Sequence, residues 1–283
     1  MIEVGTVQEL WRYPVKGMGG ERVARSTIDA RGVAGDRLWA LRDTDRAEIQ
    51  SCKTRPALLG CRASLRAGDS GAVDVLLPDG AAYGSDDPAI HGALSTLVGH
   101  ASTLAALRPA HDYDFFRRHK RDEHGWLEEL AATFEREPGE PLPALDALPP
   151  ALVDCVAVPG TFFLVTPLHL VTSATLTHLR TLRPGADWDR RRFRPNLMIE
   201  TAPGLAGLVE QDWLGRRLHA GAAVFDCVAA TPRCGAITRP QGELAQDSGM
   251  LRTVVREAAQ NVGIYLESVA AGAVGVGDRV YLA

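Results

Sequence analysis

Cysteine is scarce in this chain of 283 residues, and no two cysteines are spaced as a metal-binding or redox pair. The five cysteines are Cys52, Cys61, Cys155, Cys227 and Cys234. Disulfide frameworks use even numbers of cysteines, and zinc or iron–sulfur sites commonly use Cys-x-x-Cys pairs. The sequence therefore argues against a disulfide scaffold, a structural zinc and an iron–sulfur cluster, so any electrons would have to come from another molecule.

The chain also lacks an excess of basic residues, a long apolar run and a secretory leader. Its formal net charge is -4, which gives no basic character of the kind that binds nucleic acid. No apolar run is long enough to cross a bilayer, and residues 1–4 do not begin a signal peptide. We therefore expect a cytoplasmic protein without nucleic-acid or membrane partners. The apolar fraction of 46% is sufficient for a globular core.

Short runs of strand-forming residues make up most of the regular structure that the sequence predicts. Turn residues separate them at close spacing, which is typical of a small barrel or sandwich. The expected strands are Ile2–Tyr13, Arg37–Arg42, Leu58–Leu65, Val73–Leu77, Thr161–Val165, Leu197–Ile199 and Ala222–Ala230. The expected helices are Pro88–Val98, Ala174–Leu182 with Thr172 as N-cap, and Gly249–Val262 with one apolar stripe from Leu251 to Val262. The fold class is therefore mainly β with a few helices.

The middle of the chain differs in character from the rest. Residues 117–124 form a run of mixed charge, which predicts the solvated face of a helix. Residues 137–150 contain five prolines and no periodicity, which predicts a linker or a lid-like loop. We find no internal repeat.

The stretch from Thr231 to Gly235 carries the strongest chemical signal. It follows an expected strand, and Pro232 ends regular pairing because proline has no N–H to donate. Cys234 then lies at a turn beside Arg233, and a neighbouring cation favours the thiolate form. A thiolate is a nucleophile or a ligand for a soft metal. A buried structural cysteine is the other interpretation, and it is the commoner role of cysteine.

Several cations precede this stretch at positions where an anion could bind. Lys16 lies on a turn rich in glycine, where an ammonium group and backbone N–H groups can meet one anion, although a solvated lysine fits the same pattern. Arg37 is expected on the same strand face as Trp39. Arg194 precedes a proline and is expected in extended geometry. The arginine stretch, Arg190–Arg192, predicts a local cationic surface.

Four motifs together resemble those of the MOSC family, proteins similar to the C-terminal domain of molybdenum cofactor sulfurase. They are Tyr13-Pro14-Val15-Lys16, Gly35-Asp36-Arg37-Leu38-Trp39, Phe193-Arg194-Pro195-Asn196 and Thr231-Pro232-Arg233-Cys234. Their order is that of the subgroup containing the mitochondrial amidoxime-reducing component. Gly17 departs from that pattern, because a hydroxyl residue often follows the lysine in relatives. The resemblance implies a MOSC-type β-barrel plus a smaller N-terminal β-barrel-like domain, with an N-terminal domain over residues 1–108, a connecting segment over 109–160 and a MOSC domain over 161–283.

The resemblance also implies a pterin-based molybdenum cofactor. The residues implied to bind it are Lys16, Arg37, Thr172, Ser173, Arg194, Asn196 and Arg233. The thiolate of Cys234 is implied as the molybdenum ligand and catalytic residue. The implied reaction is the two-electron reduction of N-hydroxylated compounds such as amidoximes or hydroxylamines. Two alternatives stay open: a cofactor-binding or sulfur-carrier module without turnover, and a cysteine hydrolase that uses Cys234 with a histidine base.

The electron donor is expected to be a separate protein. No Gly-x-Gly-x-x-Gly fingerprint follows an expected strand, so the sequence gives no sign of NAD binding. We expect a ferredoxin- or flavodoxin-like carrier with its own reductase. The arginine stretch is expected to meet the acidic surface of such a carrier.

Overall fold

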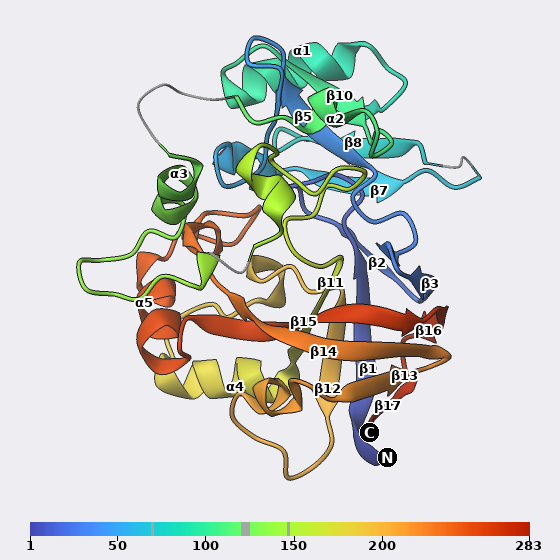
Figure 1. Ribbon diagram of the computed structural model, residues 1–283, viewed down its shortest axis with the longest axis vertical. Helices are drawn as coiled ribbons and strands as arrows, with labels where there is room; N and C mark the ends of the chain where they lie inside the picture. The colour runs from blue at the N-terminus through green and yellow to red at the C-terminus, as the bar shows by residue number, and fades with distance from the viewer. Residues whose placement is uncertain (69–70, 120–124, 146–147) are drawn as a thin grey trace.

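The computed structural model describes residues 1–68, 71–119, 125–145 and 148–283. Figure 1 shows two parts stacked along the long axis, a β-barrel near both termini and a smaller β-rich part above it. The chain begins in the barrel, leaves it for the smaller part, and returns to the barrel with β11. The expected class, mainly β with a few helices, is confirmed, as is the combination of a barrel with additional sheets.

Seven strands close the barrel, because β1 pairs with β12 as well as with β17. Their order round the barrel is β12 (Leu197–Thr201), β11 (Leu168–Thr172), β15 (Asn261–Ala270), β14 (Ala223–Pro232), β13 (Arg217–Ala220), β17 (Arg279–Leu282) and β1 (Ile2–Arg12). The short strand β2 (Glu21–Val23) extends the sheet beside β1. Inward side chains alternate with outward ones along β14, where Ala223, Phe225 and Cys227 enter the core. The strand expected before the cysteine motif is thus confirmed.

Two helices, α4 (Ser173–Leu182) and α5 (Ser248–Glu257), cover one side of the barrel and share a second core with it. Thr172 caps α4 as expected, with its hydroxyl oxygen accepting the backbone N–H of Thr175 at 3.2 Å. The expected helix to Val262 is wrong at its end. Ala259 and Gln260 adopt left-handed backbone angles (φ 44 and 62) and turn the chain into β15, where Val262 is buried.

The smaller part contains two three-stranded sheets around a third core. One consists of β10 (Ser102–Ala106), β5 (Trp39–Asp43) and β6 (Glu48–Ile49), and the other of β7 (Arg62–Leu65), β8 (Val73–Leu76) and β9 (Ala82–Gly84). The helix α1 (Ala89–Val98) packs against them. Arg37 was expected inside a strand, but it lies in the turn before β5 with a φ of 50, so that prediction is wrong. Likewise, Leu58 belongs to the 3-10 helix η1 (Pro56–Gly60), not to a strand.

A third three-stranded sheet brings strands from both ends of the chain together beside the barrel core. The strand β3 (Arg25–Asp29) pairs with β16 (Gly272–Gly275) and with β4 (Gly32–Val33). The division into residues 1–108, 109–160 and 161–283 stays a prediction. In the described part of the chain, no helix is both long and apolar enough to cross a membrane.

The connecting segment contains α2 (Tyr113–Phe116), α3 (Trp126–Ala132) and the 3-10 helix η3 (Pro150–Val153). Most of the expected charged helix, residues 120–124, lies outside the described residues. Thr161–Val165 was expected as a strand but consists of bends, because Phe162 turns into a core cluster with Phe116 and Cys155. Residues 137–144 are in turns or irregular backbone, which agrees with the expected loop.

Candidate functional site

A cavity of about 290 Å³ lies between the barrel and the smaller part. Its lining comes from turns and strand ends that are far apart in the sequence. Residues at the end of β14 meet the turn after β1, the loop after β6 and the connecting segment. Its volume is close to the lower limit for cavities that bind small organic ligands. The candidate residues Lys16, Arg37, Arg194, Arg233 and Cys234 all line it.

Positive charge dominates the polar lining of this cavity. The cations are Lys16, Arg37, Lys53, Arg192, Arg194 and Arg233. Among the described residues, no aspartate or glutamate lines the cavity. Cations in a partly enclosed space attract and bind an anion more strongly than the same cations would at an exposed surface. The cavity is therefore suited to a ligand that carries a phosphate or a similar anionic group.

Lys16 is held on its turn by backbone contacts with the strand β5. Its N–H donates to the carbonyl of Trp39 at 2.8 Å, and its Nζ donates to the carbonyl of Phe162 at 2.6 Å. Gly17 follows with a φ of 85, and a Cβ there would come within 2.7 Å of the backbone nitrogen of Cys52. Glycine is therefore required at this position, and its lack of a side chain lets the loop after β6 approach the lysine.

Burial, with the nearby charges of Arg37 and Lys53, lowers the pKa of Lys16 to about 7. Lys16 is therefore charged below that pH and increasingly neutral above it. We expect sulfate, whose charge is constant over this range, to bind at pH 6 about tenfold more tightly than at pH 8.5. A charge-assisted hydrogen bond contributes roughly 1.5–3 kcal/mol, which supports a change of this size. Titration calorimetry at the two pH values measures it.

The Lys16→Met variant is the control for this titration. It should bind sulfate weakly and with the same affinity at both pH values. His169, which also lines the cavity, does not titrate in this range, because burial and the charge of Arg233 hold its pKa well below its usual value. Equal affinity of the unmodified protein at pH 6 and pH 8.5 would exclude Lys16 as an anion ligand.

Asp36 was not singled out from the sequence, yet it joins three of the motifs. Its carboxylate accepts the backbone N–H of Tyr13 at 2.5 Å and the side-chain amide of Asn196 at 3.1 Å, and it pairs with Arg37. Burial raises the pKa of Asp36, and the Arg37 guanidinium opposes that shift. Asn196 also accepts the backbone N–H of His169 at 3.2 Å. These contacts give Asp36 and Asn196 the role of positioning Arg37, although neither lines the cavity.

Arg194 is fixed over an aromatic ring and not in the extended geometry that its proline neighbour favours. Its φ is 55, so the expected extended backbone is wrong. The guanidinium carbon lies 4.4 Å from the ring centroid of Tyr13, and Nη1 donates to the carbonyl of Met18. The Tyr13 hydroxyl donates to the carbonyl of Pro195 at 3.0 Å, which holds the ring in place. Arg194 thus presents a pre-positioned cation to the cavity.

Cys234 lies two residues after the end of β14 and is the N-cap residue of the 3-10 helix η6 (Gly235–Thr238). It is half-buried and lines the cavity, which places its thiol where a ligand can reach it. A second half-buried cysteine, Cys52, lines the same cavity from the other part of the molecule. Burial raises the pKa of Cys52, and a charge on Cys234 adds to that effect. Cys52 could not be assigned to the site from the sequence, because its neighbours form no recognisable motif.

The side chain of Arg233 is buried and anchors the turn that carries Cys234. It is 8% exposed, and its guanidinium donates to the carbonyls of Val262 at 3.0 Å and Phe193 at 3.2 Å. Nε2 of His169 lies beside this guanidinium and 3.2 Å from the carbonyl of Val262. Burial and the charge of Arg233 lower the pKa of His169, which favours the neutral ring. Burial lowers the pKa of Arg233 to about 10, which leaves it charged at neutral pH. His169 is held by these contacts and is not a free base beside Cys234, which disfavours the cysteine hydrolase alternative.

The start of α4, where Thr172 and Ser173 were expected to bind phosphate, lies away from the cavity that contains Cys234. The hydroxyl of Thr172 donates to the carboxylate of Glu210 at 2.6 Å, and burial raises the pKa of Glu210. Ser173 lies against Thr201 in a separate surface hollow, with 3.2 Å between the two hydroxyl oxygens. Neither Thr172 nor Ser173 lines the cavity that contains Cys234.

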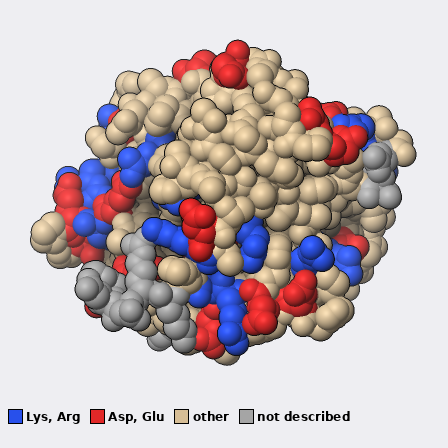
Figure 2. Space-filling model, turned by 90° about the horizontal axis from the view of Figure 1, so that it is seen from above, with Lys and Arg blue, Asp and Glu red and all other residues tan. Residues whose placement is uncertain are grey.

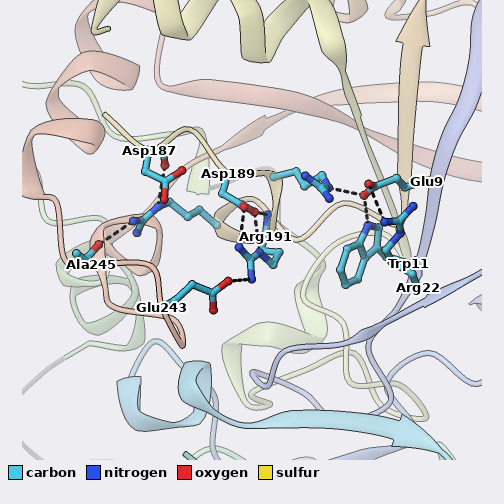
Figure 3. Close-up of polar contacts among 10 residues, drawn as sticks. Glu9, Trp11, Arg22, Asp187, Asp189, Arg191, Glu243 and Ala245 are labelled. Carbon is cyan, nitrogen blue, oxygen red and sulfur yellow. Dashed lines mark hydrogen bonds and ion pairs between the residues drawn. The ribbon is translucent and has the colours of Figure 1, made fainter. Parts of the chain in front are cut away.

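The arginine stretch does not form a free cationic surface, so that expectation is wrong. Figure 3 shows Arg191 between Asp189 and Glu243, with donor–acceptor distances of 2.8 and 2.6 Å. Arg190 forms an ion pair with Glu9, which lies 181 positions earlier in the sequence. Each exposed guanidinium therefore has a carboxylate beside it.

Arg192, the third member of the stretch, is 3% exposed and donates to four backbone carbonyls, among them that of Ala245 at 2.7 Å. Figure 2, viewed from the end of the molecule that carries α1, shows basic and acidic side chains interleaved on that face.

The barrel and the cavity beside it, lined by cations and by two half-buried cysteines, define a site suited to an anionic ligand. Comparison with known families makes this definition specific. Residues 161–281 match the MOSC domain, and residues 4–91 match the MOSC N-terminal beta barrel domain. The chain therefore belongs to the MOSC domain family, whose domains are associated in general with binding of the molybdenum cofactor.

Solved structures give more distant similarities. The chain is 11% identical to the YUAD protein from Bacillus subtilis, covering 99% of this chain and 95% of that one with a TM-score of 0.42. It is 19% identical to YiiM from Geobacillus stearothermophilus with a TM-score of 0.32, over 41% of this chain and 54% of that one. The chain thus spans about half the length of YiiM. None of the curated proteins matches the chain.

Proposed function

We propose that this protein binds a pterin-based molybdenum cofactor in the cavity and reduces N-hydroxylated compounds there, with the Cys234 thiolate as the metal ligand. One observation carries the proposal. An accessible cysteine lies at a cavity with several cations and, among the described residues, no lining carboxylate. An anionic cofactor whose metal lacks one soft ligand needs this combination.

The donor set of the cavity fits such a group. Lys16, Arg37 and Arg194 offer charged donors to a phosphate. The Thr231 hydroxyl also lines the cavity, is buried, and has no hydrogen-bond partner among the described residues, so a ligand could satisfy it. Cys234 supplies the one thiolate. When bound, the cofactor supplies two-electron redox chemistry, and the protein supplies its position and the shape of the entrance.

The reaction sets requirements that the protein must meet. Cleaving the N–O bond of an amidoxime consumes two electrons and two protons, and releases water and the amidine. Arg233 and the backbone groups it holds keep the Cys234 turn rigid while substrate enters. The electrons come, in our proposal, from a separate ferredoxin- or flavodoxin-like protein with its reductase. The neutralised arginine stretch is not part of that docking surface.

The test is to purify the protein from a host that makes molybdenum cofactor and to measure metal, pterin and turnover together. We expect about one molybdenum and one pterin per chain, and reduction of benzamidoxime when a chemical reductant or an electron-transfer pair is supplied. We expect no reduction with NADH alone, because no dinucleotide-binding fingerprint is present.

Three outcomes would change this proposal. Protein without molybdenum or pterin would contradict cofactor binding. A full complement of both without reduction by any donor would favour a cofactor-binding or sulfur-carrier module. Turnover with NADH alone would remove the separate electron carrier from the proposal.

A further inference from the structure

One side of the cavity is built by a segment outside both matched domains. This segment, here called the connecting wall, comprises residues 125–145 and Leu148 and includes α3. Figure 1 shows α3 at the side of the molecule, at the level between the smaller part and the barrel. The described residues that the wall contributes to the cavity are all apolar: Leu130, Phe134, Pro143, Ala144, Leu145 and Leu148.

Phe134 is the centre of the connecting wall. Its side chain is buried, with an exposed fraction of 6%, even though α3 itself has no buried residue. Lys53 Nζ lies 5.7 Å from the ring centroid, and the guanidinium carbon of Arg136 lies 5.4 Å from it. The ring therefore borders two cations, of which Lys53 also lines the cavity. A bound molecule can meet both cations and apolar side chains in this cavity.

Hydrogen bonds fasten the wall to both residues that flank Cys234. Arg136 Nη2 donates to the carbonyl of Arg233 at 3.1 Å, and its Nη1 donates to the carbonyl of Phe134 at 2.8 Å. On the other side, the N–H of Gly235 donates to the carbonyl of Thr133 at 3.1 Å. The position of the aromatic ring is thus coupled directly to the position of the cysteine.

Ion pairs with α5 hold the rest of the wall in place. Arg256 pairs with Glu137 at 3.1 Å, and Arg252 pairs with Glu140, which is largely buried. Figure 1 shows the loop after α3 beside α5. These contacts anchor the wall on both sides of Arg136, close to Phe134, so the ring is held in a preformed position and little ordering free energy is lost when a ligand binds to it.

We propose that the connecting wall selects substrates with an aromatic or branched alkyl body, whose N-hydroxylated group faces Cys234. This inference rests on the proposed function and adds the substrate class to it. Burying apolar surface contributes about 25 cal/mol per Å², so a phenyl group against Phe134 and Leu130 gains binding free energy that a methyl group cannot. A positively charged body would be repelled by the cations opposite the wall.

The experiment compares two substrates that share a reacting group and differ in their body, benzamidoxime and acetamidoxime. The measured quantity is the kcat/KM for benzamidoxime divided by the kcat/KM for acetamidoxime. We expect Phe134→Ala to lower this ratio about tenfold and Leu130→Ala to lower it severalfold. Leu127→Ala is the matched control, because Leu127 belongs to the same helix, is 42% exposed and does not line the cavity. It should leave the ratio unchanged.

Phe134→Leu keeps a large apolar side chain, so it should fold even if Phe134→Ala does not. We expect it to retain most of the preference for benzamidoxime. An unchanged ratio in both Phe134→Ala and Leu130→Ala would overturn the proposal, as would an equal loss of both substrates in every variant.

Binding measurements separate failure of this inference from failure of the proposed function. If the unmodified protein reduces neither amidoxime, the proposed function is wrong, and titration calorimetry with the same two compounds then tests the wall alone. Tighter binding of benzamidoxime that is lost in Phe134→Ala but kept in Leu127→Ala would support the wall. Equal affinity for both compounds in the unmodified protein would contradict it.

Discussion

Cys234→Ala is expected to abolish amidoxime reduction while leaving the fold intact. The residue is half-buried at the cavity, so the substitution removes a ligand without opening a large void in a core. The neighbouring Arg233 and Gly235 make their hydrogen bonds through their own atoms, and these should persist. We expect activity at the detection limit and a melting temperature within a few degrees of the unmodified protein. Turnover assays and thermal unfolding measure the two quantities.

Cys52→Ala is the matched control, because Cys52 is also half-buried and lines the same cavity. Burial raises its pKa, which favours the neutral thiol and makes it a poorer metal ligand. We expect this variant to keep its molybdenum and most of its activity. Wild-type turnover by Cys234→Ala would refute the ligand assignment. Equal loss in both variants would mean that the two thiols act together.

Arg233→Ala is expected to destabilise the protein by about 2–4 kcal/mol. The substitution removes the guanidinium donor from the buried carbonyls of Val262 and Phe193, and an unsatisfied buried group costs roughly 1–3 kcal/mol. It also removes a guanidinium that lies 5.4 Å from the ring centroid of Phe193. Urea unfolding should show a lower midpoint with little change in slope.

Two further variants serve as comparisons for the unfolding of Arg233→Ala. Arg233→Lys keeps a charge but cannot reach both carbonyls with one planar group, so its stability should lie between those of the unmodified protein and the alanine variant. Arg279→Ala removes an exposed arginine that pairs with Glu3 at the edge of the barrel, and it should cause no measurable change. If Arg233→Ala were as stable as the unmodified protein, the guanidinium would not be what holds the cysteine turn.

Local sequence was sufficient to predict the strand–turn–cysteine unit. The alternation along residues 223–232 requires a strand with one buried face, and Pro232 at its end cannot donate to a sheet. The same holds for Thr172, whose hydroxyl caps the following helix within four residues. These features depend on neighbours in the chain, so a single sequence contains the information needed to predict them.

Several residues singled out from the sequence lie together in the structure. The residues that line one cavity are Lys16, Arg37, Arg194, Arg233 and Cys234. Their grouping was implied by the resemblance to a family, not by their spacing, because up to about 200 residues separate them. Residues that carry no motif of their own, such as Cys52 and Phe134, could not be found in this way.

Only the tertiary structure decided which charges are free and which are neutralised. The arginine stretch resembles an exposed cationic surface in sequence, yet Glu9 and Glu243, from distant segments, pair with two of its members. Asp36 gained its positioning role from Asn196, 160 residues away. A charge interacts with whatever lies within a few ångströms, whereas periodicity and capping report only on residues within a few positions along the chain. Sequence therefore determined the local elements, and the packing of distant segments determined the electrostatics of the site.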